Sequence, residues 1–250
     1  MLASRRQELI LRHLQTQGEL SVRDLIKLLG VSRETIRRDL QALEERGALK
    51  KVHGGAVLTR VGEEPAYAAR TIAHAQEKMR IGQAALTLIE QGDILFIDSG
   101  TTTLHLATLL SPELRLTIFT NSLTIASLLV ERGLPVYVLG GLLRPGELSL
   151  SGALAQVTAE AIHVDKAFIG AGGISLHGIS DFHVEEAALR RLMIRQATKT
   201  YVLADSSKFM VTALARVVPL QEITAIITDS GLEATVQQTF AEQGVSIVLA

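Results

Sequence analysis

The sequence has no cysteine among its 250 residues. Disulfide bonds, thiolate catalysis and thiolate metal sites are therefore excluded. Long apolar runs are also missing: residues 116–130, LTIFTNSLTIASLLV, are the most apolar stretch, but they are too few and too rich in Thr, Ser and Asn to span a bilayer. The N-terminus, MLASRRQELILRHL, lacks the unbroken apolar segment of a signal peptide. We therefore expect a cytoplasmic protein with no membrane partner.

Clusters of metal ligands are not apparent either. The seven histidines are scattered, and in DFHVEE the residues His183 and Glu186 are three apart, a spacing that fits one face of a helix. Two ligands are too few for a structural zinc site. The glycine spacing and lysine of a P-loop are also missing, which argues against nucleotide hydrolysis. We expect no metal and no cofactor.

Net charge is low, at −1, but its distribution is uneven. Residues 1–60 hold 12 Lys and Arg against 7 Asp and Glu, whereas the remaining residues hold 13 against 19. Concentrated basic charge at one end is the electrostatic footprint expected of a nucleic-acid-binding segment. Apolar residues make up 47% of the chain, enough for a sizeable core.

Three short helical patterns and a hairpin fill this basic segment. Residues 4–18 carry an apolar stripe of Leu9, Ile10 and Leu14 with Leu11 nearby. Residues 21–30 begin with a serine N-cap and end at a glycine, and they bury Val22, Leu25 and either Leu28 or Leu29. Residues 32–47 again begin with serine and end at glycine, with Ile36, Leu40 and Leu43 on one side. Residues 48–58, ALKKVHGGAVL, predict a β-hairpin.

The third helical pattern presents basic residues opposite its apolar stripe. Early outward positions with Thr, Arg and Arg are typical of the helix that a helix-turn-helix inserts into the major groove. A solvated helix is the alternative for this pattern alone, but three correctly spaced helices and a basic hairpin favour DNA binding. In the hairpin, lysines suit the phosphate backbone, whereas the histidine can equally bond its own turn. We expect DNA contacts from Ser32, Arg33, Thr35, Arg37, Arg38, Gln41, Lys50, Lys51 and His53.

From residue 76 onward, short apolar runs alternate with helix-length segments. The runs are ILFID, LTIFT, VYVLG, KAFIGA, TYVLAD, AIITD and VSIVLA. Strands that alternate with helices predict a largely parallel sheet covered on both faces. We therefore divide the chain into a DNA-binding domain at 1–57, a polar, proline-containing linker at 58–73 and an α/β domain at 74–250.

The run ILFID continues into SGTTT at residues 99–103. If the threonines open a helix, the loop exposes backbone N–H groups and hydroxyls, and such an arrangement binds phosphate. A threonine-rich capping turn is the plain alternative. Other polar clusters follow the other predicted strands, where ligands gather in open parallel sheets. These clusters are TNS, the glycine pair at 140–141, GAGG, HVEEA and DSSK, and together they suit a phosphorylated polyol or sugar.

Taken in order, these motifs resemble those of DeoR-type bacterial transcriptional regulators. The residues that carry the resemblance are SVRDLIKLLGVSRETIRRDLQALEERGALKKVHGGA, EKMRIGQAAL, GDILFIDSGTTT, FTNSL, LGGLLR, SLSG, EEA and DSSKF. One departure is Lys51, where this family often has arginine and its bidentate fork. The resemblance implies a winged helix-turn-helix joined to an α/β open-sheet domain like that of ribose-5-phosphate isomerase, which binds a phosphorylated sugar.

Carried over, the resemblance implies that SGTTT holds the phosphate and that Asp98, Glu185 and Lys208 face the sugar. The full set of expected effector contacts is Asp98, Ser99, Gly100, Thr101, Thr102, Thr103, Asn121, Gly141, Gly172, Glu185 and Lys208.

Two functions fit this pattern. A sugar-phosphate isomerase needs a base and a group that stabilises an enediolate. Glu185 or Glu186 could be the base and Lys208 the stabiliser, although Glu185 could equally complement a helix dipole. A repressor released by a phosphorylated sugar explains both halves of the chain, whereas an isomerase leaves the basic segment without a purpose. We therefore expect a regulator rather than an enzyme, which binds a double-stranded operator as a homodimer or homotetramer.

Overall fold

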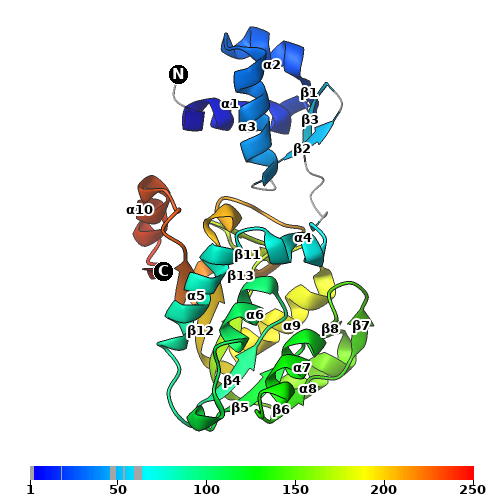
Figure 1. Ribbon diagram of the computed structural model, residues 1–250, viewed down its shortest axis with the longest axis vertical. Helices are drawn as coiled ribbons and strands as arrows, with labels where there is room; N and C mark the ends of the chain where they lie inside the picture. Colours follow the sequence, from blue (N-terminus) through cyan, green and yellow to red (C-terminus); the bar gives the residue numbers. More distant parts are fainter. Residues whose placement is uncertain (1–2, 18, 46–48, 53, 59–63) are drawn as a thin grey trace. The chain divides into compact units, whose positions relative to one another are not determined.

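The computed structural model describes residues 3–17, 19–45, 49–52, 54–58 and 64–250 (Figure 1). The chain divides into two compact units, Met1–Glu63 and Glu64–Ala250. None of the helices in these described ranges has the length and apolar character needed to cross a bilayer.

The first unit combines three helices with a small antiparallel sheet. Its elements are α1 (Ala3–Gln17), β1 (Glu19–Ser21), α2 (Val22–Leu29), α3 (Arg33–Glu45), β2 (Leu49–Val52) and β3 (Gly55–Leu58). The strand order is β1-β3-β2, and β2 and β3 form the hairpin. Three helices with such a hairpin make a winged helix-turn-helix, as the sequence predicts.

Local sequence signals explain where these helices begin and end. The Ser21 hydroxyl accepts a hydrogen bond from the Asp24 N–H at 3.1 Å, which caps α2. Gly30 ends that helix in the left-handed conformation, at φ 64°, and its N–H donates to the Ile26 carbonyl. Ser32 accepts from the Thr35 N–H at 3.2 Å at the start of α3.

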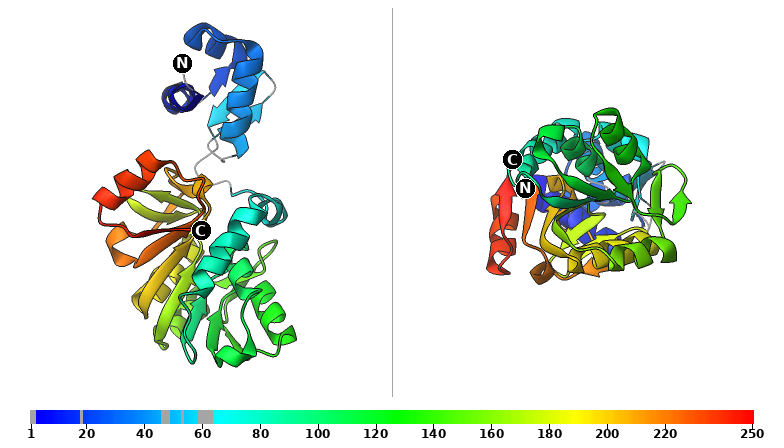
Figure 2. Two further views of the ribbon diagram at one scale, coloured as in Figure 1. Left: turned by 60° about the vertical axis from the view of Figure 1, so that its left-hand side comes forward. Right: turned by 90° about the horizontal axis from the view of Figure 1, so that it is seen from below.

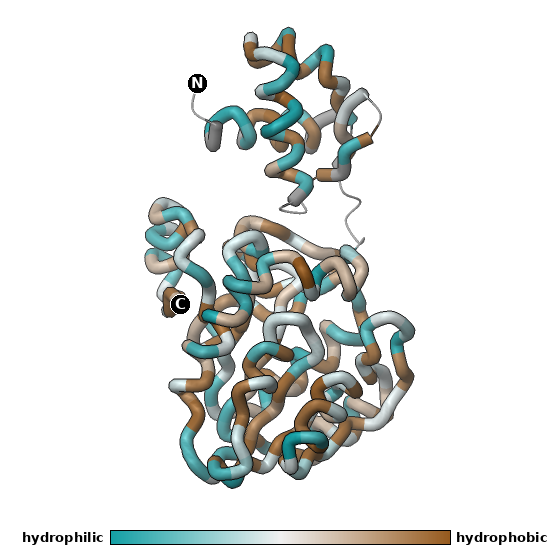
Figure 3. The backbone as a smooth tube through the Cα atoms, viewed as in Figure 1, coloured by the Kyte–Doolittle hydropathy of each residue, from teal (hydrophilic) through white to brown (hydrophobic). Residues whose placement is uncertain are grey.

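The predicted apolar stripes meet in a single core, and hydrophilic residues alternate with hydrophobic ones along the helices (Figure 3). Of the two candidates at the end of α2, Leu29 is buried and Leu28 is 47% exposed. Two residues expected in the stripes, Leu9 and Val22, are only half-buried and pack against this core. The buried apolar residues of the helices are Ile10, Leu14, Leu25, Leu29, Ile36, Leu40 and Leu43.

The second unit is built on a seven-stranded parallel sheet. Its strands, in spatial order, are β15 (Ile247–Leu249), β14 (Ala225–Thr228), β12 (Ala197–Leu203), β9 (Val164–Ile169), β4 (Ile94–Ile97), β5 (Thr117–Thr120) and β6 (Val136–Val138). Every neighbouring pair is parallel. Each of the seven predicted apolar runs forms one of these strands.

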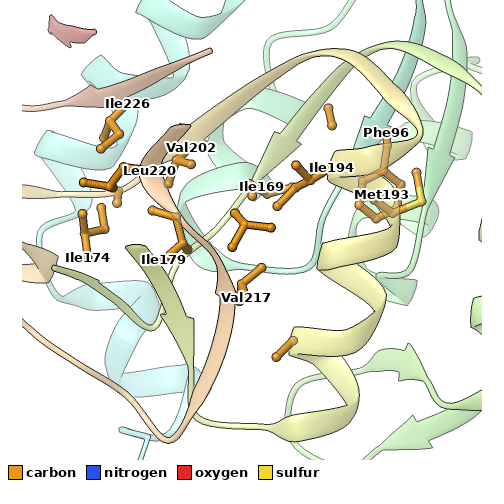
Figure 4. Close-up of a cluster of buried hydrophobic side chains, with 14 of the residues drawn as sticks. Phe96, Ile169, Ile174, Ile179, Met193, Ile194, Val202, Val217, Leu220 and Ile226 are labelled. Carbon is orange, nitrogen blue, oxygen red and sulfur yellow. The ribbon is translucent and has the colours of Figure 1, made fainter. Parts of the chain in front are cut away.

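Helices cover both faces of this sheet (Figure 2). One face packs against α5 (Ala75–Leu86), α6 (Thr101–Ala107) and α7 (Leu123–Glu131), and the other against α8 (Ala153–Glu160), α9 (Val184–Arg195) and α10 (Ala234–Glu242). Side chains of β4 alternate between the two cores, with Leu95 and Ile97 on the first face and Phe96 on the second. Figure 4 shows Phe96 in one cluster with Met193 and Ile194 of α9.

The strand order reverses between β4 and β9. From β4 the chain adds β5 and β6 on one side, and it later adds β9, β12, β14 and β15 on the other. In open parallel sheets such a switch point opens a crevice beyond the carboxyl ends of the two strands. The loop at residues 98–100 follows β4 at this position.

Two short antiparallel sheets were not among the sequence predictions. One is the hairpin β7 (Leu142–Arg144) and β8 (Ser149–Ser151), and the other contains β10 (Gly173–Ser175), β11 (Gly178–Asp181) and β13 (Ala215–Val218). Strands of three or four residues are too short to give a clear period-two pattern. Three single turns of 3₁₀ helix lie at Pro112–Leu114, Ser206–Lys208 and Leu220–Glu222.

Helix α4 (Tyr67–Ile72) lies within the segment expected as a linker, residues 58–73. Residues 59–63 of that segment lie outside the described ranges. Two polar residues of the segment that the structure does describe, Glu64 and Arg70, form an ion pair at 3.0 Å, and Arg70 also binds Glu147.

Candidate functional site

Helix α3 presents an arginine-rich face to solvent. Arg33, Arg37, Arg38 and Gln41 are exposed, and Ser32 precedes them at the N-terminus of the helix. Among the described residues, Arg38 forms an exposed ion pair with Glu34, at 3.4 Å, and no other. Such a pair contributes little to stability, so this guanidinium can exchange its partner for a base or a phosphate without a large loss.

The opposite side of α3 is fixed by a buried acid. Asp39 is 3% exposed, and its carboxylate accepts two hydrogen bonds from the Arg6 guanidinium of α1. This pair holds α3 on α1 and thereby sets which residues of α3 face outward. Thr35 is half-buried, because its N–H and hydroxyl both lie against Ser32 Oγ.

Two expected DNA contacts bind each other. The Lys51 ammonium of β2 donates to Gln41 Oε1 of α3 and lies 3.5 Å from Glu44. Lys51 therefore links the hairpin to α3 in the structure of the free chain. The side chain of Lys50 and all of His53 lie outside the described part of the chain.

The loop after β4 carries hydrogen-bond donors that have no partner among the residues that the structure describes. Ser99 N–H donates to Asn121 Oδ1 at 2.9 Å, and Asn121 Nδ2 approaches Ser99 Oγ at 3.4 Å, so the end of β5 fixes the loop. The N–H groups of Gly100, Thr101 and Thr102 form no hydrogen bond to any residue that the structure describes.

The three threonines of this loop have different roles. Thr103 is fully buried, and its hydroxyl donates to the carbonyls of Asp98 at 2.7 Å and Gly100 at 3.1 Å. The hydroxyls of Thr101 and Thr102 have no partner among the described residues, yet neither is an unpaired buried atom. Each hydroxyl therefore keeps some exposure to solvent, although Thr101 and Thr102 are only 6% and 8% exposed. Two threonines are available to a ligand, and the third holds the loop.

Asp98 lies behind the loop rather than beside it. Its carboxylate is 1% exposed and accepts hydrogen bonds from Arg190 Nε at 2.5 Å and from the Gly170 N–H at 3.0 Å. The second bond joins the ends of β4 and β9 across the switch point. Both of these partners come from the protein, and the contact between Asp98 and a sugar that the resemblance implies stays a prediction.

Arg190 of α9 is the centre of this buried network. It binds Asp181 as well as Asp98, lies 3.8 Å from Glu186 Oε2, and donates to the Ser99 carbonyl at 3.4 Å. Burial alone would lower the pKa of Arg190, but the three carboxylates raise it well above its ordinary value. Burial raises the pKa of Asp98, and Arg190 opposes that rise.

Sequence reasoning missed Arg190 and Asp181. A signal was present for Arg190: Glu186, Arg190 and Met193 share the buried side of α9, so a charged pair spaced i,i+4 interrupts an apolar stripe. No comparable signal marks Asp181, because it ends a short strand that periodicity does not reveal.

The two glutamates at the start of α9 differ in environment. Glu186 is 4% exposed and accepts from Ser149 Oγ at 2.6 Å and Arg144 Nη1 at 3.1 Å. Burial alone would raise its pKa, but Arg190, Ser149 and Arg144 lower it below the ordinary value. Glu185 is exposed, and its carboxylate lies near Gly152.

Two lysines lie at the carboxyl ends of the strands. Lys208 is half-buried, and its ammonium has no hydrogen bond among the described residues; burial lowers its pKa, which Asp205 opposes. Lys78 of α5 is 4% exposed and donates to the carbonyls of Arg70 and Ala73. Burial lowers the pKa of Lys78 to about 8.

The glycines expected at the site have packing roles. A Cβ on Gly141 would lie 2.3 Å from the Ser151 carbonyl oxygen, and one on Gly172 would lie 3.0 Å from the Asp181 Cα. These close approaches explain why glycine is required there. The structure thus joins Asp98, Ser99, Asn121 and the threonines in one bonded loop, whereas Gly141, Gly172 and Glu185 have contacts of their own.

Both units match known family models. Residues 6–60 match the DeoR-like helix-turn-helix domain, and residues 73–230 match the DeoR C terminal sensor domain.

Relatives are similar to this chain over most of its length, and a solved structure is similar to about half of it. The HTH-type transcriptional repressor GlcR of Bacillus subtilis is 38% identical over 222 residues, which cover 88% of this chain and 86% of that protein. The putative aga operon transcriptional repressor of Escherichia coli O157:H7 is 34% identical over 251 residues, which cover 98% and 93%. A solved ribose 5-phosphate isomerase A from Methanocaldococcus jannaschii is similar to 55% of this chain and of its own, with 17% identity and a TM-score of 0.42.

Proposed function

Because the chain belongs to the DeoR family of DNA-binding transcriptional regulators, we propose that it represses a sugar or polyol catabolic operon and leaves its operator when a phosphorylated sugar binds. The relatives GlcR and the putative aga repressor are both named as transcriptional repressors. The observation that carries the sensing half is the loop after β4, with its donors that lack protein partners.

The first unit supports operator binding through its exposed arginines. Arg33, Arg37 and Arg38 all lie on α3, where a winged helix-turn-helix contacts base edges and phosphates. Ser32, Thr35, Gln41, Lys50, Lys51 and His53 complete the proposed contact surface.

The loop supports binding of a phosphate. A phosphate has several acceptor oxygens and carries negative charge, and it needs donors that are not already used. The N–H groups of Gly100, Thr101 and Thr102 and two threonine hydroxyls meet that need. Lys208 adds an ammonium without an ion pair among the described residues. We propose that the sugar hydroxyls lie toward Lys208 and Glu185.

The same geometry favours sensing over isomerisation. A general base must be free to accept a proton, but Glu186 is bound to two arginines and a serine, and its lowered pKa weakens it as a base. Asp98 is likewise bound to Arg190 and Gly170. Glu185, the other candidate base, is exposed, but the relatives GlcR and the putative aga repressor are named as regulators. We therefore propose that the site binds a sugar phosphate without turning it over. Incubation of purified protein with aldose and ketose phosphates should give no isomerised product.

We propose that the chain acts as a homodimer or homotetramer, because two helix-turn-helix heads read two half-sites of one operator. Exposed apolar side chains of the second unit, such as Tyr137 of β6 and Leu154 of α8, at 61% and 71% exposure, support such assembly. Light scattering should give a mass of at least twice the 27.0 kDa of one chain; a monomer would contradict this.

A thermal-shift screen of phosphorylated sugars and polyols tests the sensing half. A ligand that binds the native state raises the melting temperature. Thr101→Val and Thr102→Val each delete a hydroxyl that has no protein partner, so we expect the free protein to melt as the wild type does. Affinity for the phosphorylated ligand should fall by roughly 10- to 100-fold, as loss of a hydrogen bond to a charged group predicts.

Thr103→Val is the matched control. Its hydroxyl bonds two carbonyls within the loop, so this variant should lose about 1–2 kcal/mol of stability. If Thr101→Val and Thr102→Val respond to ligand as the wild type does, or if no compound in the screen raises the melting temperature, the phosphate loop is misassigned.

A further inference from the structure

A chain of alternating charges starts at the effector loop. At its inner end, Arg190 contacts the loop through Asp98 Oδ2 at 2.5 Å and the Ser99 carbonyl at 3.4 Å. The same guanidinium lies 3.8 Å from Glu186 Oε2. Arg190 is therefore shared between the loop and Glu186.

The middle of the chain passes through the hairpin formed by β7 and β8. Arg144 uses its two terminal nitrogens on different acids: Nη1 binds Glu186 at 3.1 Å, and Nη2 binds Glu64 at 2.9 Å and lies 3.9 Å from Glu147 Oε1. Arg144 is thus shared in the same way as Arg190. If the Arg144–Glu186 ion pair becomes stronger, the Arg144–Glu64 ion pair becomes weaker.

The outer end of the chain is helix α4. Glu64 Oε1 binds Arg70 Nη1 at 3.0 Å, and Arg70 also binds Glu147 and donates to the Pro65 carbonyl at 2.9 Å. Glu64 is the first residue of the second unit, so α4 is the first helix after the boundary between the two units.

Helix α4 depends on these polar contacts because it buries no side chain. It has six residues, none of them buried, and Ile72 is 81% exposed. A helix this short is not stable alone. Apolar packing therefore contributes little, and the links from Arg70 and Lys78 hold α4 in place.

The charges in this chain are well placed to respond to an added anion. The six linked residues are at most 22% exposed, so solvent screens them less than surface pairs. With Glu147 and Asp181, five carboxylates share three guanidinium groups. An anion at the loop competes with Glu186 for Arg190. Glu186 then binds Arg144 more strongly.

From this geometry we propose that Arg144 and Glu64 are positioning residues that couple the effector loop to α4. Occupancy of the loop shifts Arg144 from Glu64 toward Glu186 and loosens α4 at the boundary with the DNA-binding unit. This inference rests on the proposed function of the loop, and it identifies how binding there is passed on.

Amide hydrogen exchange tests the coupling without a ligand. Ser149→Ala removes the hydroxyl that donates to Glu186, so the ion pair between Glu186 and Arg144 should become stronger. We expect the amides of residues 70–73 to exchange at least threefold faster in Ser149→Ala, measured by mass spectrometry. In an Arg144→Met background, Ser149→Ala should have no further effect on these amides.

Ser175→Ala is the matched control, because Ser175 is also largely buried and bonds only within its own turn. It should leave exchange at residues 70–73 unchanged. If Arg144→Met does not fold, the double variant Glu64→Gln/Glu147→Gln removes both acids through which Arg144 reaches Arg70. In this background Ser149→Ala should likewise have no further effect on residues 70–73. The proposal is overturned if Ser149→Ala does not change amide exchange at residues 70–73. It is also overturned if the change is the same in the wild-type and Arg144→Met backgrounds.

A second arm separates this proposal from the proposed function. Inorganic phosphate, compared with chloride at equal ionic strength, should slow exchange at residues 99–103 in both wild type and Arg144→Met. It should speed exchange at residues 70–73 in the wild type only. If residues 99–103 do not respond, the phosphate site is refuted while the mutant comparison still decides the coupling.

Discussion

Replacement of Arg190 by methionine is the sharpest test of how the second unit is held together. Arg190 is 6% exposed and binds Asp98, Asp181 and Glu186, all of which are at most 4% exposed. Methionine keeps much of the apolar stem but removes the charge. Three buried carboxylates then lose the positive charge that they all contact.

The expected loss follows from that geometry. Removal of one partner from a buried ion pair costs about 3–5 kcal/mol, because the remaining charge stays desolvated. Arg190→Met should lose at least this much at pH 7.5, a large part of the roughly 5–15 kcal/mol typical of a domain.

The loss should also depend on pH, with a defined sign. Burial already raises the pKa of Asp98, and without Arg190 that pKa rises further. A carboxyl whose pKa is higher in the folded state makes the fold more stable as pH falls toward that pKa. The destabilisation of Arg190→Met should therefore shrink by up to about 1.4 kcal/mol per pH unit between pH 7.5 and 5.5.

Urea unfolding followed by tyrosine fluorescence measures this loss in the correct unit. The three tyrosines, Tyr67, Tyr137 and Tyr201, all lie in the second unit, and the chain has no tryptophan. Arg195→Met is the matched control: Arg195 is on the same helix but its side chain is 60% exposed, so it should change stability by less than about 0.5 kcal/mol. A loss below about 1 kcal/mol for Arg190→Met, or one independent of pH, would refute the role assigned to Arg190.

Three further predictions concern other parts of the chain. Arg38→Ala should weaken binding to an operator selected from random DNA by about 1–3 kcal/mol in an anisotropy titration, whereas Arg80→Ala in the second unit should not; equal affinity for Arg38→Ala and wild type would misplace the recognition helix. Because the pKa of Lys78 is lowered to about 8 in the folded chain, the unfolded chain binds more protons than the folded chain above pH 8. The unfolding free energy should therefore rise by roughly 2 kcal/mol between pH 8 and 10, and Lys78→Met should flatten that rise. Gly141→Ala places a Cβ 2.3 Å from a carbonyl oxygen at φ +129° and should lower the free energy of unfolding by about 3 kcal/mol. Gly146 has φ +84° and open space around it, so Gly146→Ala should lower that free energy by about 1 kcal/mol. Similar losses would contradict the packing role of Gly141.

The main elements of the fold could be read from the sequence because their signals are local. Each of the seven apolar runs became a strand of the parallel sheet, and serine and glycine marked the ends of α2. The apolar stripe of α3 determined which arginines face solvent. Periodicity and capping act within about ten residues, so a single sequence displays them.

The loop at residues 98–103 was also visible, as a polar cluster after a strand. The different roles of its threonines could not be predicted. Nothing in the sequence separates Thr103, whose hydroxyl bonds within the loop, from Thr101 and Thr102, whose hydroxyls have no partner among the described residues. That difference depends on which way each side chain points after α6 has packed.

The buried charges were decided by tertiary structure alone. Asp98 and Arg190 are 92 residues apart, and Arg144 and Glu64 are 80 apart. Their pairing depends on the reversal of strand order between β4 and β9 and on short antiparallel hairpins without a clear pattern. The sequence by itself determined the strands of the parallel sheet, the three helices of the first unit and the exposed arginines through short-range hydrophobic patterning. Only the folded chain determined the short antiparallel sheets and which carboxylate meets which guanidinium, because desolvated ion pairs form wherever the topology brings distant segments together.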